Sequence, residues 1–366
     1  MIAPAPDLRD ARDLLIVKLS AMGDVIHALP VSAAIGRTFP QLRIHWVVEE
    51  FLAPLLSGNP FLASVITVPK LRLSNMRVPS ERNRYLSGLL QVRRLKADIV
   101  LDLQGLAKSA LIAGISGART RLGYHYQREC ASLVVAPVRP RPTSVHVVDQ
   151  LLDVAAFVGA DIRRVEFPLV VSSEATRSAG DMLSAAGIDA GSPFVSINPA
   201  AGHPLKQWRP ERFAELAAQC AQSTHVPVVL VTADTRVAAQ VMAHAGSSLM
   251  DLSGKTDLAQ LAAVLQLSSV HVSGDTGSAH LAAALKTPVV CLVGPTDADR
   301  IGPYGQRENV VSHSRLCDPG CSARSCRFEF PRCLDTVTPE EVRARIDVIL
   351  NSRRTCPDGL TPAARA

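Results

Sequence analysis

Aromatic residues are scarce in this chain of 366 residues, and long uninterrupted apolar runs are missing. Only 4% of the residues are aromatic although 47% are hydrophobic, and much of the hydrophobic content is alanine, valine and leucine. This composition is typical of parallel sheets covered by helices and argues against a disordered or fibrous chain. No run of about 18 uncharged apolar residues occurs, and the first residues do not form a charged segment followed by an apolar one. We therefore expect no transmembrane helix and no secretion signal, and we predict a cytoplasmic protein.

Two common nucleotide-binding signatures are also absent. No Gly-x-Gly-x-x-Gly follows the first apolar run, and no phosphate loop ends in Gly-Lys-Ser or Gly-Lys-Thr. Heptads, internal repeats and low-complexity tracts are absent as well. Any nucleotide site in this chain is therefore expected to be of another kind.

Apolar β-branched runs alternate with amphipathic stretches from residue 14 onward, which indicates β-α-β units. In the N-terminal half we expect strands at 14–18, 43–48, 64–68, 98–102 and 132–136, and helices at 24–37, 82–95, 107–115 and 146–158. In the C-terminal half we expect strands at 194–197, 228–231, 270–272 and 289–293, and helices near 210–221, 257–266 and 277–285.

The length fits two α/β domains, at roughly 100–200 residues per domain. We predict a flexible N-terminus, an N-terminal domain, a linker region with a short strand at 165–171 followed by a polar helix and a turn-rich stretch, a C-terminal domain, a helix that could cross back to the first domain, and a flexible tail. The corresponding ranges are 1–12, 13–170, 171–192, 193–338, 339–352 and 353–366.

The first polar loop, residues 18–24, follows the apolar run 14–17 and ends in Gly23 and Asp24. Asp24 can be a helix N-cap, or it can be a functional carboxylate at the carboxyl end of a strand, where open α/β sheets bind ligands. Its position alone leaves both interpretations open. Ser20 and Met22 belong to the same loop.

Two further segments of the N-terminal half are expected to meet this loop. Residues 102–109 end a strand and begin a helix, and they contain Gln104 and Lys108. His146 stands at the start of another helix, where a capping or core role is the alternative to binding.

A second polar constellation, Asp275-Thr276-Gly277 with His280, opens a helix after the strand at 270–272. Backbone N–H groups and the helix dipole at such a turn suit a diphosphate. Residues 294–297 end the next strand and could complete the same crevice. Lys206, in the loop after the first strand of this half, can be a solvated lysine or can offset charge on a departing phosphate. Trp208 is predicted to be a packing anchor.

Cysteines and basic residues supply two further hypotheses. Cys317, Cys321, Cys326 and Cys333 could hold zinc, but their spacing matches no standard zinc knuckle, so free thiols are the favoured interpretation. Cys130, Cys220 and Cys291 are interpreted as buried small hydrophobes.

The stretch from residue 70 to residue 96 contains eight basic residues and a single acidic one, Glu81. This excess of positive charge predicts an anionic neighbour, either phosphate, nucleic acid or lipid headgroups.

Together these segments resemble a known family. Residues 18–30, 102–109, 274–281 and 294–297 are similar, in this order, to the lipopolysaccharide heptosyltransferases of glycosyltransferase family 9. The likeness runs from about residue 14 to 305, and it is greatest to the heptosyltransferase I branch.

The resemblance implies the GT-B arrangement, with two facing Rossmann-like doubly wound domains and a cleft between them. It implies an inverting transfer of L-glycero-D-manno-heptose from an ADP donor to the Kdo or inner-core region of lipopolysaccharide, with no metal or other cofactor required. Asp24 would be the general base. The donor would be bound by Lys206, Asp275, Thr276, Gly277 and His280, and the acceptor by Ser20, Met22, Gly23, Gln104, Lys108 and His146.

These implications extend to partners and location. We expect ADP-heptose and an anionic lipid-linked acceptor as ligands, a monomer, and a peripheral position on the inner face of the inner membrane, where the strip 70–96 would contact lipid. Nucleic acid is not expected, because Tyr85 is the only aromatic residue in that strip and single-strand binding relies on stacking. The alternatives are a transferase for another sugar or acceptor, a nucleotide-sugar epimerase, and a nucleotide-gated binding protein.

Overall fold

The computed structural model describes residues 6, 8–70, 78–223, 226–246, 249–314, 326, 328 and 330–355. Contacts divide the chain into two compact units, Met1–Val170 and Val171–Ala366. Each unit is built around its own parallel sheet and is described separately below.

The first unit contains a six-stranded parallel sheet in the order β3-β2-β1-β4-β5-β6. Its strands are β1 (Asp13–Val17), β2 (Arg43–Glu49), β3 (Leu62–Val68), β4 (Ile99–Asp102), β5 (Thr120–Tyr124) and β6 (Ala136–Val138). This is the doubly wound order, in which the direction of winding reverses between β1 and β4. Ligands of such sheets bind at the carboxyl ends of the strands on either side of that reversal.

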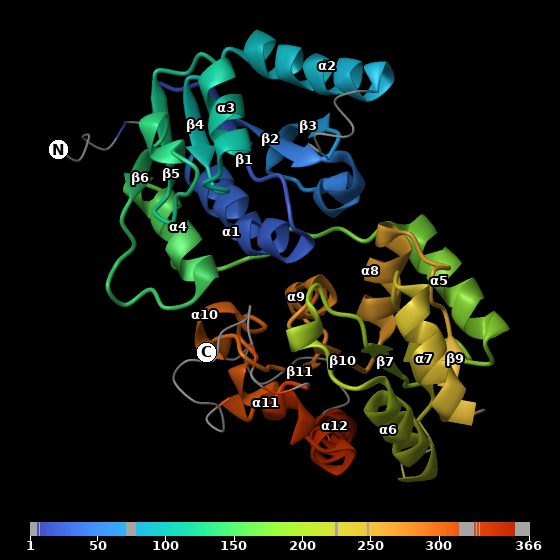
Figure 1. Cartoon of the computed structure of the whole chain (residues 1–366). Coiled ribbons are helices and arrows are strands. Elements are labelled where there is room, and N and C mark those ends of the chain that lie inside the picture. Colours follow the sequence, from blue (N-terminus) through green and yellow to red (C-terminus); the bar gives the residue numbers. More distant parts are fainter. Residues whose placement is uncertain are drawn as a thin grey trace. The chain divides into compact units, whose positions relative to one another are not determined.

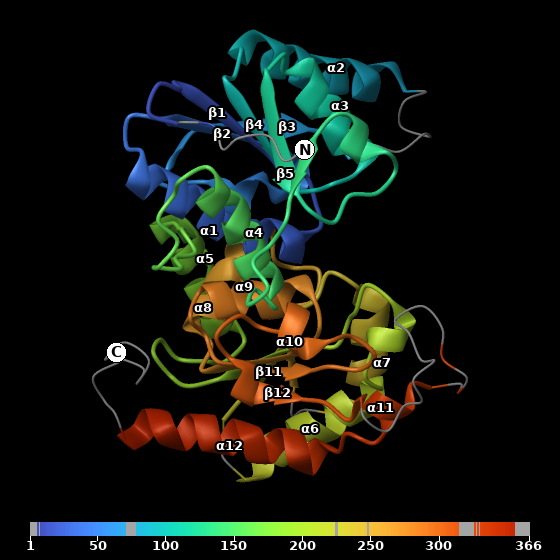
Figure 2. The same ribbon diagram turned by 90° about the vertical axis from the view of Figure 1, so that its left-hand side faces the viewer.

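Helices cover both faces of this sheet, as Figures 1 and 2 show. They are α1 (Met22–Thr38), α2 (Pro79–Leu95), α3 (Ala107–Ile115) and α4 (Val147–Phe157), with short 3₁₀ turns η1 (Glu50–Leu56) and η3 (Ala131–Leu133). The pair α1 and α4 packs on one face, and the pair α2 and α3 on the other. Buried apolar side chains of β1, β2, β4, α2 and α3 form the core on the second of these faces.

The second unit repeats this topology with other strands. Its order is β12-β11-β10-β7-β8-β9, which is again the doubly wound order, with the reversal between β7 and β10. The strands are β7 (Val195–Asn198), β8 (Val228–Leu230), β9 (Leu249–Asp251), β10 (Val270–Gly274), β11 (Val289–Leu292) and β12 (Val310–Val311). All of their pairings are parallel.

The helices of the second unit also lie on both faces of its sheet (Figure 2). They are α5 (Ser173–Ala185), α6 (Pro210–Ser223), α7 (Thr235–Ala245), α8 (Leu258–Leu267), α9 (Gly277–Ala284), α10 (Ala298–Ile301), α11 (Arg332–Asp335) and α12 (Pro339–Thr355), with 3₁₀ turns η4 (Pro204–Lys206) and η6 (Arg307–Asn309). One core joins α6, α7 and α12 to the sheet. Trp208 is its anchor, as predicted: it is buried, its ring meets Phe213 edge-on, and its Nε1 donates to the Val337 carbonyl at 3.1 Å.

Several sequence predictions of elements are wrong. The segment 132–136 is not a strand, because Leu133 is 84% exposed in η3 and the strand β6 begins at Ala136. The stretch 165–171 also forms no strand. The strands and α-helices missed are β5, β9, β12, α7, α10 and α11. The missed strands are short or, in the case of β5, contain arginine and glycine in place of a β-branched run.

Two segments at the edges of the predicted domains have roles inside the second unit. The region 171–192, predicted as a linker, contains α5, which packs on α8. The buried side chains of α12, among them Val342 and Ile346, belong to the core of the second unit. The crossing of this helix to the first domain stays a prediction.

Cysteine burial agrees with the sequence interpretation at two of three positions. Cys220 and Cys291 are buried, whereas Cys130, the N-cap of the surface turn η3, is exposed. Within the described ranges, no helix is both long and apolar enough to cross a bilayer.

Candidate active site

The loop between β1 and α1 lies at the reversal point of the first sheet and is shaped by the neighbouring loop after β4. The Gln104 side-chain oxygen accepts hydrogen bonds from the N–H groups of Leu19 and Ser20, at 3.0 and 3.2 Å. These bonds show that Gln104 holds the neighbouring loop in place, and its predicted binding of acceptor stays a prediction. Asp102 supports this second loop by accepting from the N–H groups of Gln104 and Gly105.

Asp24 stands in the first turn of α1 but is not the N-cap of this helix, because the N-cap is Ala21 and Asp24 is the third helical residue. Its role as a functional carboxylate stays a prediction. Asp24 Oδ2 accepts from the Ala21 N–H at 3.1 Å, so it satisfies the backbone donor of the N-cap residue. The side chain is nevertheless exposed. A carboxylate that makes this contact and stays open to solvent can still accept a proton from a bound ligand.

A buried lysine beneath this loop was not selected from the sequence. Lys18 is 6% exposed, and its Nζ donates to the Leu103 carbonyl at 2.8 Å. Burial lowers the pKa of Lys18, and the nearby carboxylates of Asp24 and Asp102 partly oppose this. The only signal in the sequence is a lysine that directly follows an apolar strand.

Apart from Lys108, which is described below, the remaining residues predicted to bind acceptor divide into two groups. Ser20, Met22 and Gly23 are part-exposed in the same loop and first helical turn as Asp24. His146 is the N-cap of α4, where its Nδ1 accepts from the Val148 N–H at 3.1 Å. The capping alternative is therefore confirmed, and acceptor binding by His146 stays a prediction.

In the second unit, the loops at the reversal point bring three predicted residues together. Lys206 Nζ donates to Asp275 Oδ2 at 2.7 Å, and His280 Nε2 lies 3.3 Å from Asp275 Oδ1. Burial would raise the pKa of Asp275, but the contacts with His280 and Lys206 outweigh it and hold the pKa at about 2. Asp275 is therefore charged at neutral pH. It orients a lysine whose side chain is 23% exposed.

Close approach of these two loops requires a glycine. A Cβ on Gly274 would lie 2.9 Å from the Lys206 carbonyl oxygen. Any larger residue would push the loop of Lys206 away from Asp275. The next glycine, Gly277, is the first residue of α9.

A buried chain of hydroxyl groups leads from inside the sheet toward this turn. The Ser268 hydroxyl donates to the Val270 carbonyl at 2.7 Å and accepts from the Ser196 N–H. The Ser196 hydroxyl, 2.9 Å away, must therefore donate to Ser268. Consequently the Ser196 oxygen accepts from His271 Nδ1, which lies 2.9 Å from it.

The chain of hydrogen bonds continues from His271 to the start of α9, and its donors and acceptors can be assigned in the same way. Burial lowers the pKa of His271 to about 3, so the ring is neutral and its Nε2 accepts from the Ser278 hydroxyl at 3.0 Å. Asn198 Nδ2 donates to Ser278, and the Thr276 hydroxyl, 3.0 Å away, donates to it as well. Because the Thr276 proton points inward, an anion at this turn would depend on backbone N–H groups and Lys206.

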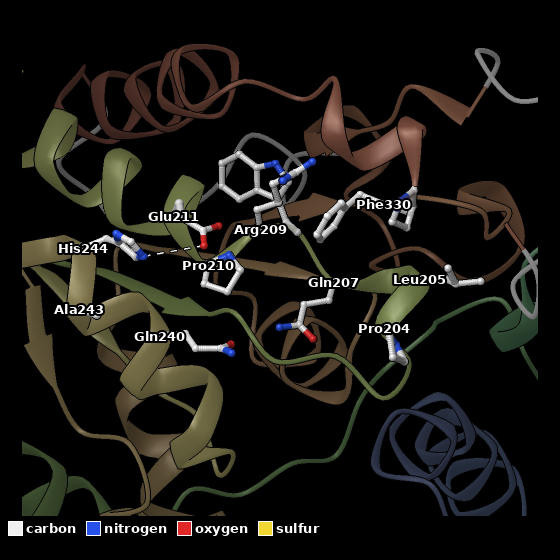
Figure 3. A pocket seen from close by; sticks show the side chains of 12 residues that line it. Pro204, Leu205, Gln207, Arg209, Pro210, Glu211, Gln240, Ala243, His244 and Phe330 are labelled. Carbon is white, nitrogen blue, oxygen red and sulfur yellow. Dashed lines mark ion pairs between the residues drawn. The ribbon is translucent and has the colours of Figure 1, made fainter. Parts of the chain in front are cut away.

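Two pockets flank these loops in the second unit. Figure 3 shows one of about 520 Å³ that is lined by the segment after Lys206, including Gln207 and Arg209, and by Phe330. The Arg209 guanidinium lies 3.8 Å from the Phe330 ring centre. Lys206 itself is not part of this lining. The second pocket, of about 850 Å³, is lined by Pro295, Thr296 and Asp297 and by other residues up to 314.

The cysteine cluster is only partly within the described residues. Cys317 and Cys321 lie outside them, Cys326 is a free thiol and Cys333 is buried. Among the described residues, no group of three or more His, Cys, Asp and Glu side chains has the arrangement of a metal site.

Comparisons with known proteins agree with this architecture. The model of glycosyltransferase family 9 (heptosyltransferase) matches residues 89–329. The chain is 28% identical over 362 residues to lipopolysaccharide heptosyltransferase 1 of Pseudomonas aeruginosa, covering 93% of this chain and 99% of that protein.

Solved structures share the fold. A family 9 glycosyltransferase of Veillonella parvula aligns with a TM-score of 0.79 and 22% identity, covering 95% of this chain and 99% of that one. Escherichia coli heptosyltransferase WaaC with ADP aligns with a TM-score of 0.72 and 24% identity, covering 92% and 99%. Because the family model spans most of the chain, this protein belongs to glycosyltransferase family 9 and is a glycosyltransferase of the GT-B, α/β two-domain class.

Proposed function

We propose that this protein transfers L-glycero-D-manno-heptose from ADP-heptose to the Kdo-bearing inner core of lipopolysaccharide, with inversion at the anomeric carbon. The observation that carries the proposal is the placement of Asp24 at the reversal point of one sheet and of Lys206 and Asp275 at that of the other. The similarity to the heptosyltransferase of P. aeruginosa and the ADP in the WaaC structure support the choice of donor.

In the proposed reaction, an acceptor hydroxyl oxygen attacks the anomeric carbon of the heptose. The bond from that carbon to the diphosphate oxygen breaks, and its electron pair leaves with ADP. Asp24 accepts the hydroxyl proton, a step that typically contributes 10²–10⁴-fold in rate. Lys206 and the N–H groups at the start of α9 offset the negative charge that develops on the leaving diphosphate.

A transfer assay tests this proposal. The purified protein is incubated with ADP-heptose and Kdo-lipid A, and the acceptor is analysed by mass spectrometry. We expect a gain of one heptose residue together with release of ADP. Parallel reactions with UDP- and GDP-sugars test a transferase of other specificity. Conversion of the donor without acceptor would instead indicate an epimerase, and no product with any donor would contradict the proposal.

We further propose that α2 docks the enzyme on an anionic membrane surface. The exposed side of α2 carries Leu86 and Leu90, one turn apart and 46% and 54% exposed, between the exposed Arg82, Arg93 and Arg94. The single acidic residue of α2, Glu81, pairs with Arg84 instead. Paired leucines flanked by arginines suit the boundary between headgroups and acyl chains. Arg72 and Arg77 of the basic strip lie outside the described residues.

Vesicle sedimentation tests the docking of α2. We expect the protein to bind phosphatidylcholine vesicles that contain phosphatidylglycerol and not vesicles of phosphatidylcholine alone. Replacing both Leu86 and Leu90 with serine should weaken binding by about tenfold or more, because their exposed halves together amount to about one leucine side chain, roughly 1.5–3 kcal/mol when buried. Leu133→Ser, at a leucine that is 84% exposed outside α2, is the matched control. Equal binding of the double variant and the wild type would contradict the proposal.

A further inference from the structure

A buried carboxylate lies beneath the β1–α1 loop and has no part in the mechanism so far. Glu49, the last residue of β2, is 1% exposed. Its backbone N–H donates to the Leu19 carbonyl at 3.0 Å, which ties it to the loop that precedes Asp24. Its Oε1 accepts from Lys108 Nζ at 2.9 Å. Glu49 therefore joins the end of β2 to the two loops at the reversal point of the first sheet.

Lys108 connects this buried group to the surface around Asp24. Its side chain is 24% exposed, and its Nζ also donates to Ser20 Oγ at 3.4 Å. An ammonium group has three N–H donors, so one donor remains after Glu49 and Ser20. Asp24 bonds to the next residue, Ala21. Lys108 therefore contacts Ser20, and Asp24 contacts Ala21, the next residue of the same loop.

In the Glu49–Lys108 ion pair, only one of the two carboxylate oxygens has a hydrogen-bond partner within the described residues. Glu49 Oε2 is buried and has no hydrogen-bond partner among them, and the same holds for the buried Tyr85 hydroxyl. Burial raises the pKa of Tyr85, and the Glu49 charge raises it further. A buried carboxylate with an unused oxygen is costly, and apolar residues of similar volume would usually stabilise a fold at least as well. A structural role is therefore a weak explanation for this arrangement.

We propose that Glu49 is a positioning residue that holds Lys108, the lysine predicted to bind acceptor, beside the Asp24 loop. The inference rests on the proposed function, whose Kdo acceptor carries a carboxylate that the Lys108 ammonium can bind, and it adds a residue that acts on this contact from beneath the loop. Glu49 balances the lysine charge from below, while the third N–H donor reaches the ligand. Without Glu49, the flexible four-carbon stem would let the ammonium leave this position.

The steady-state kinetics of Glu49→Gln, Lys108→Met and the double variant test this inference, with Kdo-lipid A and its carboxylate methyl ester as acceptors. Glu49→Gln and Lys108→Met should each raise the KM for the acid acceptor about tenfold, the order expected for one charge-assisted hydrogen bond. The KM for ADP-heptose should not change. Because Glu49 acts through Lys108, the double variant should show no further increase. The wild type should prefer the acid to the methyl ester, and the variants should lose this preference.

Asp13→Asn is the matched control. Asp13 is another buried carboxylate of the same sheet, paired with Arg43 and His45, but it stands at the amino end of β1. This variant should melt at a lower temperature with an unchanged acceptor KM. The Glu49→Gln/Lys108→Met double variant should melt no lower than the wild type. An unchanged acceptor KM in Glu49→Gln, or a double variant whose defect is the product of the single defects, would overturn the inference.

Calorimetric titration of the wild type and Glu49→Gln with the acid acceptor, without donor, needs no sugar transfer. It distinguishes failure of this inference from failure of the proposed function. Equal affinities in that titration would overturn the positioning role even if transfer is observed. A weaker affinity of the variant would support the role even if the transferred sugar proves to be another one.

Discussion

Asp24→Asn is expected to reduce heptose transfer by about 10²–10⁴-fold, because it removes the proposed proton acceptor. The asparagine side-chain oxygen can still accept from the Ala21 N–H, so this contact is kept. The melting temperature should therefore stay close to that of the wild type. ADP-heptose should still bind in calorimetry, since the residues proposed to hold it belong to the other unit.

Asp24→Ala separates the two roles of the carboxylate. This variant loses the hydrogen bond from the Ala21 N–H as well as the base, so it should also lose about 0.5–1.5 kcal/mol of stability. Turnover of Asp24→Asn near the wild-type rate would show that another group accepts the proton. Equal melting temperatures of the Asn and Ala variants would show that the contact with Ala21 does not contribute to stability.

The second large effect is expected at Lys206. Lys206→Met should lower transfer by about 10²–10³-fold, the loss typical of removing one group that stabilises developing charge. Because the Thr276 proton is committed to Ser278, this hydroxyl cannot replace the lost ammonium at the diphosphate. The affinity for ADP should fall as well, and calorimetry with ADP alone measures that part.

A second consequence of Lys206→Met is structural and can be separated from the catalytic one. The substitution removes the Lys206 ion pair of the Asp275 carboxylate, whose side chain is 7% exposed, and keeps its contact with His280. An uncompensated buried charge destabilises, so the melting temperature should fall. Adding Asp275→Asn should restore much of the stability without restoring transfer.

Lys286→Met is the matched control for Lys206→Met. Lys286 is an exposed lysine of the same unit that follows the opposite end of α9. Its removal should change neither ADP binding nor transfer. If Lys286→Met and Lys206→Met reduced ADP affinity equally, the effect would come from net charge and not from the contact with Asp275.

The elements that the sequence predicted are those whose hydrophobic pattern is local. The strands β1, β2, β4, β7, β10 and β11 are short apolar runs, and a run that is buried on both faces needs no alternation to be recognised. The segment 132–136 has the same kind of apolar pattern, but most of it lies in η3 and before β6 and forms no strand. Contacts with distant segments, which the local pattern does not contain, determine where the strand begins.

From the sequence, candidate site residues could be selected only in the loops that follow strands. Asp24, Lys206, Asp275 and His280 could be selected because each stands in or just after such a loop. Glu49 and Lys18 could not be selected, because their importance comes from partners far away in sequence. Lys108 is 59 residues from Glu49, and Leu103 is 85 residues from Lys18.

The sequence by itself determined that this chain alternates strands with helices and places polar, glycine-containing loops after several strands, because these features depend on residues close together in the chain. Only the tertiary structure decided the order of the strands, with β1 beside β4 and β7 beside β10. That order results from packing between distant segments. It brings the loops of Asp24 and Lys108 together in one sheet and those of Lys206 and Asp275 together in the other, and it creates the buried Glu49–Lys108 pair that no local pattern reveals.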